Sequence, residues 1–159
     1  MQSYGFDSPK ILKGTVSRVE DGFLQYITST TKSGFARQRT VVQDGSATAE
    51  IDWRERAFVI EGTRTPVDQL KRKVSNFTET RYWRWQHGEE YKARYSNADE
   101  MWTVTASTGE VVAELGSYIS RPKTLPILRL AESLRSASER RFLLLVLLYS
   151  EAKRLDRAD

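Results

Sequence analysis

An uninterrupted apolar run, Phe142–Tyr149, constrains the fold of this chain more than any other feature. These eight residues are too few to cross a bilayer core, which takes about 20 residues in a helix. The run is apolar on every helical face rather than along one stripe, which is typical of a helix buried on all sides. Hiding these side chains contributes on the order of 15 kcal/mol before entropy, at roughly 1.5–3 kcal/mol each. The rest of the chain must therefore wrap around this helix.

The sequence just before the run predicts where the helix begins. Ser136 and Glu139 have the spacing of a capping box, in which the serine caps the helix and the glutamate reaches back to it. Basic pairs stand on both sides, Arg140-Arg141 before the run and Lys153-Arg154 after it. We expect this helix to be the core of the domain and not a membrane anchor.

The part of the chain before the helix has the punctuation of an antiparallel β protein, with short β-prone stretches separated by turn signals. The predicted strands are 10–19, 23–28, 35–42, 47–53, 57–60, 101–106 and 111–115, together with a tryptophan-rich hairpin over 81–95. The polar stretch 29–34 is predicted to be a turn. Residues 125–131 fit the periodicity of a helix and that of a strand, and they stay unassigned.

Length and composition indicate one globular domain. The chain has 159 residues, of which 39% are hydrophobic, 29% charged and 11% aromatic, enough for a proper core. We expect a flexible N-terminus over 1–9 and a single domain over 10–157. Cysteine is absent, which excludes disulfides, thiolate chemistry and cysteine-ligated metals. The N-terminus has no apolar region of a secretory signal, so we expect a cytoplasmic protein.

Few residues point to catalysis. The single histidine, His87, stands at the predicted tip of the hairpin, whereas a catalytic triad needs its histidine beside a nucleophile and oriented by a carboxylate. Zinc sites usually take several nitrogen or sulfur ligands. The acidic pairs Glu20-Asp21, Glu89-Glu90 and Asp99-Glu100 fall in predicted turns. An enzyme is therefore not supported, and we expect neither a metal nor a cofactor.

The tryptophan-rich hairpin is predicted to have two different faces. If Gly88 is left-handed in a three-residue turn, odd-numbered residues pair with odd-numbered ones. Strand alternation then separates an aromatic face from a basic face. The aromatic face is Trp83, Trp85, Tyr91 and Tyr95, and the basic face is Arg84, Lys92 and Arg94. We expect the aromatic face to pack against the helix, and the basic face to be either solvated or a binding surface.

Positive charge is concentrated toward the C-terminus. Residues 121–157 hold nine basic and four acidic residues, a net charge of +5, whereas the whole chain carries +4. Lys71-Arg72-Lys73 is a second cluster. Such patches attract phosphorylated lipid headgroups, an acidic leaflet or nucleic acid, and a merely solvated surface is the alternative. Nucleic acid is disfavoured because the sequence has no recognisable reading motif.

The order of several short motifs resembles a fungal, largely basidiomycete, domain-of-unknown-function family of the tubby C-terminal-like superfamily. The motifs are Ala49–Trp53, Thr65–Leu70, Tyr82–Lys92, Val111–Glu114 and the apolar helix closing on Glu151–Arg154. The resemblance implies an antiparallel β-barrel wrapped around the C-terminal helix. Because this chain is shorter than tubby or scramblase domains, some strands are expected to be short or missing. Tubby domains bind phosphoinositides, and scramblase-like relatives act at membranes.

The expected function is that of a non-enzymatic binding domain that docks peripherally on anionic phospholipid headgroups or membrane surfaces. The candidate anion-binding residues, chosen by charge clustering, are Lys71, Lys73, Arg84, Lys92 and Arg94. The alternative is a small-molecule binder or an enzyme of fungal secondary metabolism that uses a barrel cavity. That cavity would be lined by Trp53, Trp83, Trp85 and Trp102. The sequence leaves the oligomeric state open.

Overall fold

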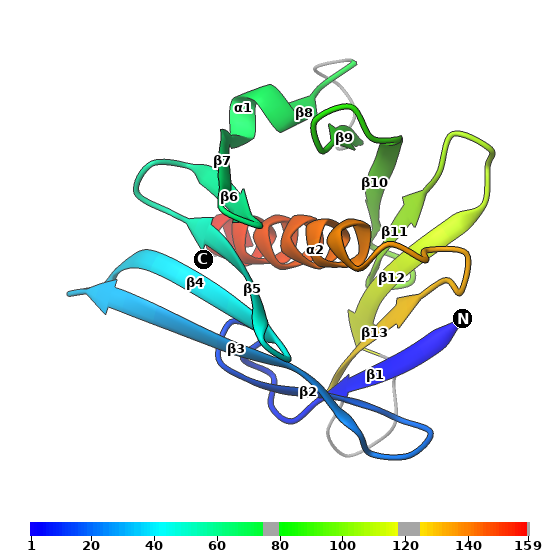
Figure 1. The fold of residues 1–159 in the computed structure, drawn as a ribbon, viewed down its shortest axis with the longest axis horizontal. Helices are drawn as coiled ribbons and strands as arrows, with labels where there is room; N and C mark the ends of the chain where they lie inside the picture. Colours follow the sequence, from blue (N-terminus) through cyan, green and yellow to red (C-terminus); the bar gives the residue numbers. More distant parts are fainter. Residues whose placement is uncertain (75–79, 118–124, 159) are drawn as a thin grey trace.

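A computed structural model describes residues 1–74, 80–117 and 125–158 of the chain (Figure 1). It is mainly β, as expected: thirteen strands form one antiparallel sheet, and the C-terminal helix α2 (Ala137–Ala158) packs against it. The strands are β1 (Gln2–Phe6), β2 (Gly14–Arg18), β3 (Leu24–Ser33), β4 (Ala36–Asp44), β5 (Ala47–Asp52), β6 (Ala57–Ile60), β7 (Thr63–Pro66), β8 (Lys71–Arg72), β9 (Arg81–Arg84), β10 (Glu90–Ser96), β11 (Met101–Thr105), β12 (Val111–Ser117) and β13 (Pro126–Leu130).

The sheet is a meander in which the last strand along the chain pairs with the first. From β1 to β7, and again from β8 to β13, each strand pairs with the next along the chain, and β13 pairs with β1. The two edge strands, β7 and β8, are consecutive in the chain and are joined by the short helix α1 (Val67–Leu70). No ladder joins these two edges within the residues that the structure describes. Figure 1 shows the sheet curving around α2.

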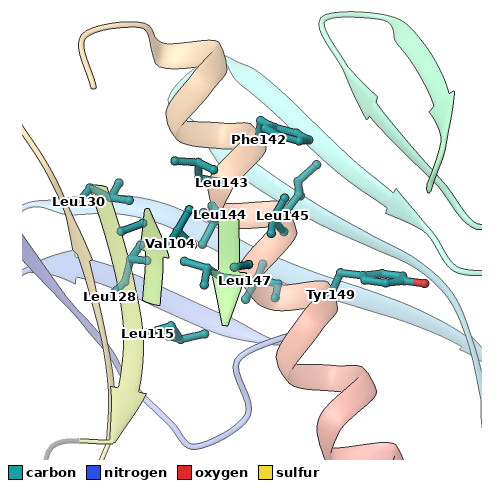
Figure 2. Packing of buried hydrophobic residues seen from close by; sticks show 14 of the residues in the cluster. Val104, Leu115, Leu128, Leu130, Phe142, Leu143, Leu144, Leu145, Leu147 and Tyr149 are labelled. Atoms are coloured by element: carbon teal, nitrogen blue, oxygen red, sulfur yellow. The ribbon is translucent and has the colours of Figure 1, made fainter. Parts of the chain in front are cut away.

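The apolar run of α2 is the centre of the core, which confirms the prediction from its composition. Every side chain from Phe142 to Leu148 is 0% exposed, and Tyr149 is 3% exposed. Val104 of β11 and Leu128 of β13 are among the strand residues that face the helix in Figure 2. None of the helices in the described ranges has the length and hydropathy needed to cross a membrane.

The helix begins where the capping box predicts, although only one half of the box forms. The backbone N–H of Glu139 donates to Oγ of Ser136 at 3.3 Å. The carboxylate of Glu139 accepts a hydrogen bond from the Tyr91 hydroxyl at 2.6 Å. The glutamate therefore ties the start of α2 to β10.

The predicted turn over 29–34 is wrong, because β3 continues through most of this stretch and pairs with β4. Its threonines are β-branched and suit a strand, and their hydroxyls find partners. Oγ1 of Thr28 donates to the carbonyl of Ile11 at 3.1 Å, and Oγ1 of Thr30 to the carbonyl of Leu12 at 2.7 Å. Polar residues in this strand are satisfied locally, so they do not end it.

Two strands differ from the sequence-based assignment. The unassigned stretch 125–131 forms β13, which pairs with β12 on one side and β1 on the other. The sequence placed no strand before Lys10, yet β1 occupies Gln2–Phe6 with Tyr4 and Phe6 buried. Because β1 pairs with both β2 and β13, it connects the two halves of the meander.

The tryptophan-rich hairpin forms β9 and β10 with the predicted pairing, Trp83 opposite Tyr91. Its turn differs from the prediction, because the left-handed residue is Gln86 (φ 49°) and not Gly88. Gly88 is instead closely packed: a Cβ there would lie 2.9 Å from Oε1 of Glu139 and 3.0 Å from the carbonyl oxygen of Trp85. The hairpin tip thus rests tightly on the start of α2.

Candidate anion-binding site

A hollow of about 370 Å³ opens beside the C-terminal half of α2. Its walls come from the β5–β6 turn, from β8, β9 and β11, and from α2 itself. We call it the cationic hollow, because six basic side chains and one carboxylate line it. The lining residues are Arg56, Lys71, Arg81, Lys153, Arg154 and Arg157, the carboxylate of Asp156, and Trp83, Trp102, Tyr149 and Ser150.

An aromatic ring holds two of these cations. The ring of Tyr149 stacks on Trp53 with centroids 5.3 Å apart, and it makes a T-shaped contact with Trp83, with centroids 5.9 Å apart. Nζ of Lys71 lies 5.8 Å from the Tyr149 centroid, and Nζ of Lys153 lies 5.7 Å from it. Ammonium groups are attracted to the face of an aromatic ring at such distances. The core therefore supports two lysines at the hollow without neutralising them.

The carboxylates near the hollow already have partners. Asp156 accepts two hydrogen bonds from the Arg37 guanidinium, at 2.9 and 3.0 Å, and this bonding lowers the pKa of Asp156. Glu151 accepts from Nε1 of Trp102 at 2.7 Å and also binds Arg154. Within the described part of the chain, neither Lys71 nor Lys153 forms an ion pair. The hollow thus keeps an excess of positive charge.

The pKa of Lys71 is lowered by burial and by this excess of positive charge. Burial lowers the pKa of its ammonium most, and the neighbouring cations Arg81 and Arg56 lower it further. Like charges and desolvation both disfavour the charged form of a lysine. An anion bound in the hollow would act in the opposite direction and stabilise the ammonium.

Trp83 adds an unused donor. Its side chain is 1% exposed, and its Nε1 has no acceptor within the residues that the structure describes. Buried donors without a partner are uncommon in native proteins. Trp83 therefore holds an unsatisfied donor that the protein encloses within the wall of the cationic hollow.

A purely structural role explains only part of this charge. Lys153, Arg154 and Arg157 lie near the C-terminus of α2, where cations offset the partial negative charge of the helix end. Lys71 and Arg81 belong to β8 and β9, and they bring their charge from the sheet. The strands therefore add cations to a helix end that already carries its own.

Only one of the five predicted anion-binding residues, Lys71, lines this hollow. Lys73 is exposed just after β8, and Arg84 lies opposite Glu90 in the β9–β10 ladder. Lys92 and Arg94 project from β10 on the outer surface, as the alternation predicts, beside a groove of about 330 Å³ that Asp99 also lines. The predicted set is thus divided between different surfaces. Arg121 and Lys123, counted in the C-terminal charge cluster, lie outside the described residues.

The four tryptophans are also divided. Trp83 and Trp102 line the cationic hollow. Trp53 stacks on Tyr149 and donates from Nε1 to Oγ1 of Thr40 at 2.8 Å, so it supports the ring from beneath. Trp85 packs against Phe142 nearer the start of the helix, with centroids 5.7 Å apart. These rings pack around α2 rather than around one shared space.

A second basic surface was missed by sequence reasoning. A groove of about 560 Å³ lies beside the β3–β4 hairpin, and we call it the hairpin groove. Among the described residues, its lining has four basic side chains and no carboxylate: Lys10, Lys13, Lys32 and Arg37 with Pro9, Ile11, Leu12, Thr30, Ala152 and Leu155. These cations are spread over the N-terminal part of the sequence, and only the pairing of β2, β3 and β4 gathers them. The Arg37–Asp156 ion pair joins this groove to the cationic hollow.

Comparisons with protein-family models, with curated proteins and with solved structures found no match for this chain. Within the described residues, no group of three or more histidine, cysteine, aspartate or glutamate side chains is arranged to hold a metal ion. His87 is exposed in the β9–β10 turn. The cationic hollow and the hairpin groove are therefore the main indications of function.

Proposed function

We propose that this domain docks on anionic membranes by binding phospholipid headgroups in the cationic hollow, without catalysing a reaction. The observation that carries the proposal is the ratio of six basic side chains to one carboxylate around a hollow of about 370 Å³. That volume lies within the range of about 300–1,000 Å³ typical of small-ligand pockets. Because the one carboxylate, Asp156, is bound to Arg37, a phosphate group would meet mostly cations.

The placement of the cations also suits a phosphate at a surface. Basic residues near an anionic leaflet contribute roughly 1 kcal/mol each. Lys71 and Lys153 sit over Tyr149, whose packing in the core fixes their position. A preorganised pair of ammonium groups loses less conformational entropy on binding than two free side chains.

We further propose that the fold is a β-barrel of the tubby C-terminal-like superfamily, wrapped around α2. The support is the order of the short motifs in the sequence, together with a meander whose two edges are joined directly by α1. Amide hydrogen exchange tests closure, because a β7–β8 ladder protects backbone N–H groups on both edges. Fast exchange along both strands would show that no ladder joins them and that the sheet is open.

The second candidate is a soluble small molecule that carries a phosphate. The observation that favours it is the aromatic part of the lining, where Trp83 and Trp102 offer apolar walls beside the cations. The interior of the sheet is filled by Phe142–Leu148, so such a ligand would occupy the same cationic hollow. The two candidates therefore share their residues and differ in whether a lipid surface is required.

Co-sedimentation with vesicles tests the proposal. Wild-type protein should bind vesicles of phosphatidylcholine with 30% phosphatidylserine, or with phosphoinositide, and not vesicles of phosphatidylcholine alone, and added salt should weaken the binding. The double variant Lys153→Gln/Arg157→Gln should bind about thirtyfold more weakly, at about 1 kcal/mol per residue. Equal binding of the wild type to neutral and anionic vesicles would overturn the proposal.

The matched control is Lys92→Gln/Arg94→Gln, which removes the same charge from the outer face of β10. It should retain most of the binding, because these residues lie outside the cationic hollow. Equal loss in both variants would show that diffuse charge, and not the hollow, attracts the membrane. Binding of soluble inositol phosphates with no binding to anionic vesicles would favour the small-molecule candidate.

A further inference from the structure

The tip of the β3–β4 hairpin carries an apolar side chain in full contact with solvent. Phe35 follows Gly34 at the turn, and its relative exposure is 104%. Gly34 has a φ of 64°, and a Cβ there would meet nothing within 4 Å. All residues from Thr31 to Ala36 are exposed, so the tip extends away from the body of the protein. In Figure 1 the hairpin reaches beyond the other strands on the side of the C-terminus.

The hairpin is held firmly from just behind its tip. The Arg37 guanidinium binds Asp156 of α2 through two hydrogen bonds and lies over the Trp53 ring, 5.1 Å from its centroid. Oγ1 of Thr30 is 2.7 Å from Oγ1 of Thr40 across the two strands. A projecting hairpin fixed behind its tip presents Phe35 in one direction, beside the C-terminal end of α2.

The surroundings of the tip are basic and partly apolar. Lys32 and Arg37 flank it, and Lys10 and Lys13 line the same hairpin groove, whose lining contains no carboxylate from the part of the chain that the structure describes. Leu155 of α2 also lines the groove and is 45% exposed. Cations that surround exposed apolar side chains are the pattern of interfacial membrane elements, in which aromatic rings enter the acyl boundary and the cations meet the headgroups.

We infer that the β3–β4 hairpin inserts Phe35 into the interface of an anionic bilayer while the lysines of the hairpin groove contact the lipid phosphates. The inference deepens the proposed function and rests on it, because it supplies a reason for a lipid surface rather than a soluble anion. The two claims involve separate residues. Headgroup binding needs the cationic hollow, whereas insertion needs the hairpin tip.

Site-specific fluorescence tests the insertion directly. The chain has no cysteine, so Ser33→Cys places a single environment-sensitive dye beside the tip and leaves Phe35 intact. Glu20→Cys places the same dye beyond the opposite end of β3, about 30 Å away at roughly 3.3 Å per residue. With vesicles containing 30% phosphatidylserine, the dye at position 33 should shift to the blue and be quenched by nitroxide-labelled lipids. The dye at position 20 should do neither.

Affinity measurements with matched phenylalanines complete the test. Phe35→Ala should weaken binding to these vesicles about tenfold, because a largely buried phenylalanine ring is worth roughly 1.5–3 kcal/mol when fully removed from water. Phe23→Ala removes a second exposed phenylalanine among the described residues, which is 55% exposed at the far end of β3, and should leave the affinity unchanged. Both variants should keep the wild-type melting temperature and the wild-type affinity for soluble inositol phosphate.

The outcomes separate the two claims. If the wild type binds anionic vesicles but the dye at position 33 is unaffected and Phe35→Ala binds normally, the insertion is wrong and the headgroup site stands. If the dye shifts and Phe35→Ala weakens binding while Lys153→Gln/Arg157→Gln binds normally, the insertion stands and the cationic hollow is not the headgroup site. If the wild type binds soluble inositol phosphate but no vesicle, the insertion is overturned.

Discussion

The two ends of the helix α2 differ in how fully their charges are paired. At the start, Arg141 is buried and pairs with Asp44 at 3.0 Å and with Glu61 at 3.4 Å, and Glu139 binds the Tyr91 hydroxyl. At the other end, Lys71 and Lys153 rest on the Tyr149 ring with hollows around them and no carboxylate partner in the described chain. We call the start of α2 the closed end, because paired charges hold it together. We call the other end the open end, because its unpaired cations remain available to a ligand.

The titration of buried groups follows the same division. At the closed end, burial and the hydrogen bond to Glu139 raise the pKa of Tyr91, so its proton is held in place. At the open end, burial and the cations Arg81 and Arg56 lower the pKa of Lys71, which weakens its hold on its proton. The first arrangement stabilises the fold, and the second is relieved when an anion binds. This contrast favours a structural role for one end and supports the proposed binding at the other.

The largest expected effect tests the core between the two ends. Leu145→Asp places a carboxylate where the native side chain is 0% exposed. An unpaired charge in such a site costs several kcal/mol or more, which is comparable to the whole stability of a small domain. The variant should lose its cooperative thermal transition, as followed by circular dichroism and calorimetry.

Leu155→Asp is the control for this substitution, since it makes the same change on the same helix at a residue that is 45% exposed. It should melt within a few degrees of the wild type. Truncation after Ser138 should unfold the domain as Leu145→Asp does, by emptying the sheet of its core. A truncated protein with a wild-type melting transition would show that α2 is an appendage on an independently stable sheet.

The next effect tests the tight packing at the closed end. Gly88→Ala brings a Cβ to 3.0 Å from the carbonyl oxygen of Trp85 and 2.9 Å from Oε1 of Glu139. The backbone oxygen cannot move without shifting the hairpin, so unfolding free energy should fall by about 1–3 kcal/mol, as for other overpacked sites. Denaturant titration measures this change.

Gly5→Ala in β1 is its counterpart, because a Cβ there meets only Cγ2 of Val19 at 3.9 Å, which is ordinary contact. Its unfolding free energy should stay within about 0.5 kcal/mol of the wild type. Equal effects of the two substitutions would mean that the closed end is no more tightly packed than an ordinary strand. The contrast between the two ends would then rest on charge alone.

How far the sequence predicts this molecule depends on whether a feature is local. The apolar run from Phe142 to Tyr149 and the cap at Ser136 are local patterns, and both are confirmed. The pairing of Trp83 with Tyr91 follows from the length of the turn and is also confirmed, although the left-handed residue is Gln86 and not Gly88. β1 was missed because its residues, which include Gly5, carry a weak strand signal, and its pairing with β13 joins distant parts of the chain.

The candidate site is less predictable for the same reason. Charge clustering along the chain found Lys71 but grouped it with Lys92 and Arg94, which belong to another surface. The cationic hollow combines residues from the β5–β6 turn, three strands and the helix end, so it exists only once the sheet has curved around α2. Sequence reveals how many cations a chain has, whereas the fold decides which of them meet.

The smallest effect concerns the proton on Lys71 and uses sulfate, whose charge is constant above about pH 3, as the probe. Because the pKa of Lys71 is lowered, this lysine is neutral in part of the range below the ordinary lysine value of about 10.4. As pH rises through the lowered pKa, the hollow loses one positive charge and sulfate affinity should fall about fivefold, or about 1 kcal/mol. Isothermal titration calorimetry in buffers of different ionisation enthalpy should detect proton uptake on binding in that window.

Lys71→Arg sharpens this test, because arginine keeps its charge throughout the range. The other charged groups that act on the pKa of Lys71 are Arg81, Arg56, Asp68 and Arg157. The variant should therefore bind sulfate with less pH dependence than the wild type and take up fewer protons. Identical profiles for both proteins would place the anion away from Lys71. The helix-end cations alone would then account for the binding, and the strands would contribute charge without contributing to the site.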